Sequence, residues 1–136
     1  MYGYIRDEVS PEDYVLGGGY VPQKETLVED GDWTRYLPLF ERQAKNFETA
    51  GCSVFGTLNA LEMLFNRLTG KESNFSDRFL YILAGIRPPG GSAHKVAEVI
   101  RDNGLILEDK LPMTKTFDDY IKPDPIPVDL LIEGQH

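Results

Sequence analysis

Cysteine is almost absent from this chain of 136 residues, which contains only Cys52. A single thiol excludes an intrachain disulfide, and it is typical of a reducing compartment or of a cysteine kept for its chemistry. Long apolar runs are also missing, because none reaches the roughly 18 residues that a membrane span needs. The segment Met1–Asp13 is charged and has no apolar core, so it does not resemble a signal peptide. We therefore expect a protein without a membrane partner, either cytoplasmic or associated with a virion.

Basic residues are also scarce. The chain has 14 Lys and Arg against 22 Asp and Glu, and its formal net charge is -8. Binding to nucleic acid needs clustered cations that neutralise phosphates, so this balance argues against such a partner. The acidic pairs at 7–8, 29–30 and 118–119 lack the spacing of metal-binding loops. We therefore predict no metal and no cofactor.

Apolar periodicity predicts three helices within one domain-sized chain. The first covers 50–68, where apolar residues recur at intervals of three and four and predict a largely buried helix that ends near Gly70. The second begins at the capping signal Ser76-Asp77 and runs to about Gly85. The third runs from about Ser92 to Asn103-Gly104. The aromatic residues are predicted to lie in the core, and they include Trp33, Phe40, Phe47, Phe65 and Phe79.

The remaining segments carry weaker signals. Residues 1–31 are predicted to be an irregular N-terminal extension, because glycine and proline interrupt every regular pattern. Residues 105–107 are predicted to be extended. Residues 113–136 are predicted to be a Pro-rich extended C-terminal segment, because Pro123, Pro125 and Pro127 exclude helix at their positions.

Cys52 is the first candidate for chemistry because it follows Gly51 and opens the predicted helix 50–68. Unpaired backbone N–H groups and the positive end of the helix dipole lie in a first helical turn. Both stabilise a thiolate, which is the nucleophilic form of cysteine. The alternative is that Cys52 is a small buried apolar residue.

The sequence around Cys52 resembles the papain-like (C1) cysteine peptidases. Gly51–Gly56 is similar to the family's segment around the nucleophile, and Asp32-Trp33 resembles the Asp-Trp that begins the mature family domain. Four further matches follow Cys52 in the order and near the spacing that the family has: Asn59–Glu62, Ser76–Leu80, Gly90-Gly91 with the helix after it, and Glu108–Pro112. The resemblance covers residues 32–112 and implies the mainly helical left half of a papain-like α+β fold, in a divergent, disulfide-free form of phage or bacterial type.

The resemblance also implies roles for individual residues. Cys52 would attack the scissile carbonyl and form an acyl-enzyme. Gln43, nine residues before Cys52, would supply the side-chain amide of the oxyanion hole, and Asn46 is the alternative at six residues. Gly90 and Gly91 would let an extended substrate backbone approach and pair. The other interpretations are an exposed glutamine and a plain turn before a helix.

The sequence departs from the family mainly in its general base. The family has a His and an Asn roughly 130–150 residues after the nucleophile. His94 stands 42 residues after Cys52, at a position that lines the cleft in the family, and His136 is the last residue. We therefore expect a cysteine peptidase that acts on peptide or protein substrates and is completed by residues outside this chain, either from a C-terminal half of the same gene product or from another chain.

Two alternatives remain open from the sequence. The first is a non-catalytic papain-like module that binds peptide or contributes to a larger assembly such as a phage particle, where other virion proteins would be its partners. It is suggested by the missing base and by Ser53, which stands where the family usually has an aromatic residue. The second is a small helical interaction protein whose likeness to the family is accidental.

Overall fold

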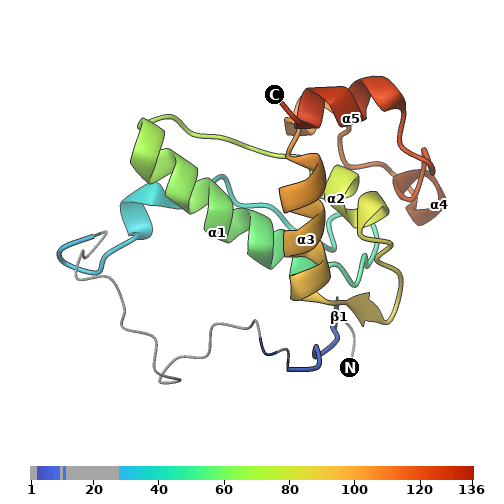
Figure 1. Cartoon of the computed structure of the whole chain (residues 1–136), viewed down its shortest axis with the longest axis horizontal. Coiled ribbons are helices and arrows are strands. Elements are labelled where there is room, and N and C mark those ends of the chain that lie inside the picture. Colours follow the sequence, from blue (N-terminus) through green and yellow to red (C-terminus); the bar gives the residue numbers. More distant parts are fainter. Residues whose placement is uncertain (1–2, 10, 12–27) are drawn as a thin grey trace.

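The computed structural model describes residues 3–9, 11 and 28–136, and it belongs to the α+β class with a majority of helices (Figure 1). The predicted irregular structure of residues 12–27 lies outside the described residues. The elements in chain order are β1 (Gly3–Tyr4), η1 (Thr34–Tyr36), α1 (Cys52–Thr69), α2 (Asp77–Leu83), β2 (Gly90–Gly91), α3 (Ala93–Asn103), η2 (Glu108–Lys110), α4 (Phe117–Tyr120) and α5 (Val128–Gly134). In the described part of the chain, no helix is long and apolar enough to cross a bilayer.

The three helices that the sequence predicts are confirmed, and local capping explains their ends. Helix α1 stops at Gly70, which has a left-handed φ of 67°. Helix α2 starts after Ser76, whose side chain accepts a hydrogen bond from the Phe79 N–H. Helix α3 starts after Ser92, whose side chain accepts one from the Lys95 N–H. These signals lie within four residues of each helix end, which is why the sequence alone reveals them.

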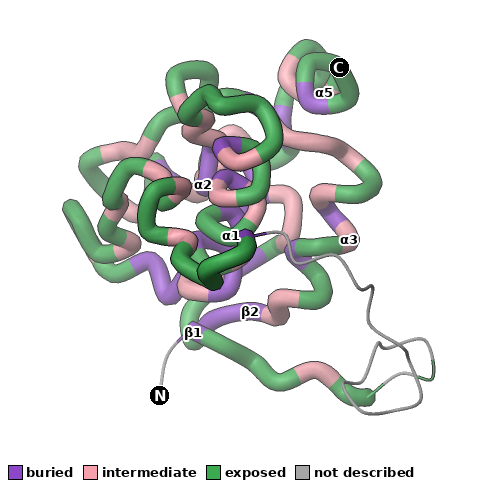
Figure 2. Tube along the Cα trace, turned by 90° about the vertical axis from the view of Figure 1, so that its left-hand side faces the viewer, coloured by how far each residue is buried: buried purple, intermediate pink, exposed green. Residues whose placement is uncertain are grey.

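The core lies where α1, α2 and α3 meet, with α2 at its centre (Figure 2). Phe79, Leu80, Tyr81 and Ile82 of α2 are all buried. Tyr81 also packs edge-to-face against Tyr120 of α4, with ring centroids 4.9 Å apart. The short C-terminal helices therefore cover the side of α2 that α1 and α3 leave open.

Helix α1 is less buried than its apolar periodicity predicts. Leu64, Phe65 and Leu68 are exposed, whereas the polar Glu62 and Asn66 are buried. Glu62 accepts a hydrogen bond from the Phe75 N–H, and Asn66 accepts one from the Ser73 N–H. The core-facing side of α1 therefore binds the backbone of the loop that follows the helix, at Ser73 and Phe75. Part of the apolar stripe of α1 remains exposed to solvent.

Other expectations from the sequence are also wrong. Phe40 was predicted to lie in the core, but its side chain is 83% exposed. The segment 113–136 was predicted to be extended, but it contains α4 and α5. The prolines do not break these helices, because Pro127 stands at the N-cap of α5 and not inside it. A threonine cap, Thr116, starts α4 by accepting a hydrogen bond from the Asp119 N–H.

Candidate functional site

Cys52 is the first residue of α1, and its side chain is partly accessible. The residue before it, Gly51, offers no side chain to cap the helix, and the first turn contains no acidic residue. The first backbone N–H groups of an 18-residue helix therefore lie beside the thiol without a carboxylate cap. The predicted position of Cys52 at the start of a helix is confirmed.

The loop before Cys52 is held rigidly by buried hydrogen bonds. The Tyr81 hydroxyl donates to the Thr49 carbonyl at 2.7 Å, and the Gly51 N–H donates to the Thr49 side chain at 3.1 Å. Ala50 has a positive φ of 54°, which an alanine adopts only at a cost in conformational energy. The central helix α2 thereby fixes the direction from which the chain enters the first turn of α1.

Replacing Tyr81 with phenylalanine tests this anchor. The change removes one hydroxyl and leaves the fully buried Thr49 with an unpaired carbonyl, so we expect a loss of about 1–2 kcal/mol in the free energy of unfolding. Chemical denaturation measures the loss. Tyr36→Phe, at a half-buried surface position, is the control and is expected to leave the free energy unchanged. Equal effects of the two changes would show that the Thr49 contact contributes nothing specific.

Strand β1 places the beginning of the chain directly against Cys52. Gly3 pairs with Gly90 and Tyr4 with Gly91 in a parallel register. The Gly3 N–H donates to the Pro89 carbonyl, and the Ile5 N–H donates to the Gly91 carbonyl at 3.0 Å. A Cβ built on Gly3 would lie 2.5 Å from Cys52 Sγ. The structure thus brings together Cys52 and the Gly90-Gly91 pair that the sequence singles out, with an extended backbone between them.

A shallow groove of about 530 Å³ runs from Cys52 along α1. Ser53 lies in its wall and is only 5% exposed, and its Oγ has no hydrogen-bond partner among the described residues. A buried hydroxyl without a partner is uncommon in native proteins, and the Ser53 Oγ is such an atom beneath the surface of the groove. The groove is lined by Tyr4, Cys52, Ser53, Gly56, Thr57, Ala60, Leu61, Leu64 and Ala93.

The two candidate amides lie elsewhere. Gln43 is half-buried in the loop before α1 and does not line the groove. The Asn46 side chain donates to the Thr114 carbonyl at 2.6 Å, which ties its amide to the C-terminal segment. The structure therefore gives neither amide a contact with the Cys52 groove, and the oxyanion role of Gln43 stays a prediction.

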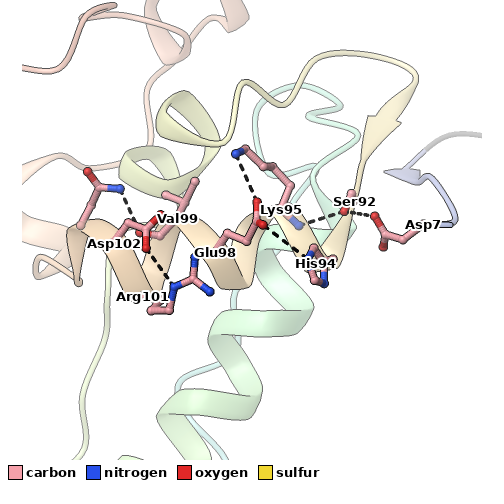
Figure 3. Close-up of polar contacts among 9 residues, drawn as sticks. Asp7, Ser92, His94, Lys95, Glu98, Val99, Arg101 and Asp102 are labelled. Carbon is pink, nitrogen blue, oxygen red and sulfur yellow. Dashed lines mark hydrogen bonds and ion pairs between the residues drawn. The ribbon is translucent and has the colours of Figure 1, made fainter. Parts of the chain in front are cut away.

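The two histidines also have other neighbours. His94, in the first turn of α3, is 57% exposed and lies 3.5 Å from Glu98, one turn further along the helix (Figure 3). His136 is exposed, and its backbone N–H donates to the Glu133 carbonyl. Ser92, just before α3, bonds to Asp7 of the N-terminal segment (Figure 3). His94 is therefore placed to pair along its own helix.

A group of buried carboxyl groups is a feature that the sequence patterns did not indicate. Glu62 and Asp77 are buried, and Glu108 is partly buried nearby. Burial raises the pKa of Glu62 from its usual 4.5 to about 7, and it raises the pKa of Glu108 to about 7 as well. Burial also raises the pKa of Asp77, with a hydrogen bond to Glu41 as a further cause.

The only sequence signal for these acids was the helical register of Glu62, four residues after the buried Leu58. Asp77 and Glu108 border a second cavity of about 500 Å³ together with Arg42 and Lys45. Among the described residues, no three His, Cys, Asp or Glu side chains are placed to hold a metal ion. We therefore interpret Glu62 and Glu108 as acids that accept hydrogen bonds from the backbone of neighbouring loops, and Asp77 as an acid that pairs with Glu41.

No family model matches the chain, and no curated protein matches it.

Proposed function

We propose that this chain is the nucleophile-bearing half of a papain-like cysteine peptidase, with Cys52 as the nucleophile. One observation carries the proposal: Cys52 opens a long helix beside a strand position, at Gly90-Gly91, in which an extended backbone already lies. Extended peptides are recognised through such main-chain pairing. Attack on a peptide carbonyl requires a thiol held close to the backbone of a bound peptide, and the closeness of Cys52 to the paired strand supports this role.

The proposed reaction has two steps. Cys52 Sγ forms a bond to the carbonyl carbon of the scissile peptide, and the C–N bond breaks as the amine leaves with the proton that the base took from the thiol. Water then hydrolyses the thioester and restores the thiol. Backbone N–H groups at the start of α1 would stabilise the oxyanion, because they are fixed in place before the substrate binds.

The base of this reaction would come from outside the chain. His94 pairs with Glu98 on its own helix, so we do not assign it this role. The uncovered apolar side of α1, with Leu64 and Leu68 exposed, continues from the groove at Cys52. We propose that the segment carrying the base packs on this side, because that would cover the apolar residues and bring an imidazole to the end of the helix that holds the thiol.

Replacing Cys52 with alanine in the longest product of the gene tests the proposal. We expect hydrolysis of a fluorogenic peptide library to fall by about 10³-fold or more, because the covalent step is lost. Initial rates at saturating substrate measure the change. Thr69→Ala, at the other end of α1, is the matched control and is expected to keep full activity. Peptide cleavage that persists in Cys52→Ala would overturn the assignment of the nucleophile.

A non-catalytic peptide-binding module is the second candidate, and the pairing of β1 with β2 favours it directly. Main-chain pairing needs no thiol chemistry, so this function would survive the loss of Cys52. The same assay separates the two candidates. Absence of turnover in the wild-type gene product, together with peptide binding that Cys52→Ala retains, would support the binding module and reject the peptidase.

A further inference from the structure

The N-terminal segment lies along the Gly90-Gly91 strand like a ligand. Two backbone hydrogen bonds hold it there, from the Gly3 N–H to the Pro89 carbonyl and from the Ile5 N–H to the Gly91 carbonyl. A third contact joins the Asp7 carboxylate to the Ser92 hydroxyl at the start of α3. The segment is therefore bound mainly through its backbone, as an extended peptide from another molecule would be.

The contact between this segment and the site leaves no room for a side chain at one position. A Cβ on Gly3 would lie 2.5 Å from Cys52 Sγ and 3.4 Å from Cys52 Cβ. Gly3 also has a φ of 119°, a conformation that residues with a side chain rarely adopt. The position over the thiol therefore requires glycine for two independent reasons, crowding and backbone conformation.

The facing residue of β2 makes the same demand from the other side. A Cβ on Gly90 would overlap the backbone of Gly3, and Gly90 has a φ of 147°. Gly90 is therefore needed for the two backbones to come this close, and Gly3 is needed for the segment to lie this close to Cys52. The next residue of the segment differs, because the Tyr4 side chain is 58% exposed and borders the groove.

We propose that the strand position beside Gly90-Gly91 selects extended peptides with glycine at the residue over Cys52, and that residues 3–7 occupy it as an internal ligand. This inference rests on the proposed function insofar as that function makes the groove a peptide site. It adds the class of ligand: a peptide with glycine over the thiol, running parallel to Gly90-Gly91, with a large side chain accepted at the following residue. Cys52 is only partly accessible with residues 3–7 in place, and full access to it then depends on their release.

Alkylation of Cys52 by iodoacetamide in the full chain tests this selection. Gly3→Val places a side chain against Sγ and should release the segment, so the alkylation rate should rise about tenfold through greater opening. Ile5→Pro removes one pairing N–H without entering the core and should act in the same direction. Gly70→Ala is the control, because it strains a positive φ where nothing lies within 4 Å, and it should leave the rate unchanged.

Peptides added to the released variants test the glycine requirement. An acetylated, amidated peptide with the sequence of residues 2–7 should slow alkylation of Gly3→Val and Ile5→Pro back toward the wild-type rate. The same peptide with alanine in place of its glycine should give no protection. Equal protection by both peptides, protection by neither, or unchanged alkylation in both variants would each overturn the inference.

These outcomes are separate from the test of the proposed function. Alkylation reports access to Sγ and peptide protection reports binding, and neither needs a peptide bond to break. Suppose that only the glycine peptide protects Cys52 and that the longest gene product cleaves no peptide. The selection for glycine would then be supported, and the proposed peptidase activity would be rejected.

Discussion

Replacing Arg78 with alanine is expected to lower the free energy of unfolding by about 3–5 kcal/mol, the largest effect that we predict for a single side chain. The Arg78 guanidinium donates to the carbonyls of Pro112 and Tyr120, each at 3.0 Å, and to that of Asp119 at 2.5 Å. It also donates to the carbonyl of Lys122. One side chain on α2 thus holds the segment that carries α4.

The effect should be large because, among the described residues, the carbonyls of Pro112, Tyr120 and Lys122 accept from no other donor. The Asp119 carbonyl also accepts from the Lys122 N–H. A hydrogen bond from a charged donor contributes about 1.5–3 kcal/mol, and bonds that share one group do not add fully. Loss of Arg78 would also loosen Tyr120, which packs on Tyr81 in the core. Urea denaturation followed by circular dichroism measures the change.

Two further variants sharpen this experiment. Arg78→Lys keeps the charge but lacks the planar fork, so it should recover less than half of the loss. Arg101→Ala, on the exposed side of α3, removes an arginine that pairs with Asp102 and should change stability little. A similar result for Arg78→Ala and Arg101→Ala would contradict the role of Arg78 as an anchor of the C-terminal segment.

The second large effect concerns pH. The pKa of Glu62 rises from 4.5 to about 7 in the folded chain, mainly because burial disfavours its charged form. Between these values the folded chain keeps a proton that the unfolded chain has released. The stabilising contribution of this group is therefore fully present below pH 4.5, and it is lost as pH rises to about 7. Glu108 and Asp77, whose pKa values are also raised, act in the same direction.

Glu62→Gln is the variant that isolates this effect. Glutamine imitates the uncharged acid and keeps an oxygen that can accept the Phe75 N–H. We expect it to stabilise the protein by up to about 3 kcal/mol at pH 8 and by less than about 1 kcal/mol at pH 5. Denaturant titrations at the two pH values measure both effects.

An exposed acid provides the control for the pH experiment. Glu29→Gln changes the net charge by the same amount at a position exposed to solvent, and it should affect stability little at either pH. A wild-type protein that becomes more stable from pH 5 to pH 8, with no benefit from Glu62→Gln, would show that Glu62 is charged in the folded chain.

The helices could be predicted from the sequence where a residue near the helix end acts locally. Ser76, Ser92 and Gly70 define their helix ends through contacts with residues at most four positions away. The short helices α4 and α5 were missed because four and seven residues are too few for a clear periodicity. Helix α4 packs on Arg78 and Tyr81 of α2. Helix α5 is held instead by the loop after α3, where the Leu105 N–H donates to the Gly134 carbonyl.

The candidate site was only partly predictable for a similar reason. Cys52 at a helix start follows from local sequence, and so does the absence of side chains at Gly90-Gly91. The partner of that pair, Gly3, lies far away along the chain, and strands of two residues carry no alternation that a pattern could reveal. Glu62 was hidden for another reason, because it stands within an apolar stripe whose burial depends on what packs against it.

By itself, the sequence determined the three main helices, the start of α1 at Cys52 and the acidic balance of the chain, since each depends on composition or on residues a few positions apart. Only the tertiary structure decided which side of α1 is covered, which carboxyl groups hold protons near neutral pH, and what lies over the thiol. These depend on contacts between residues distant in the chain, which form only when the elements pack.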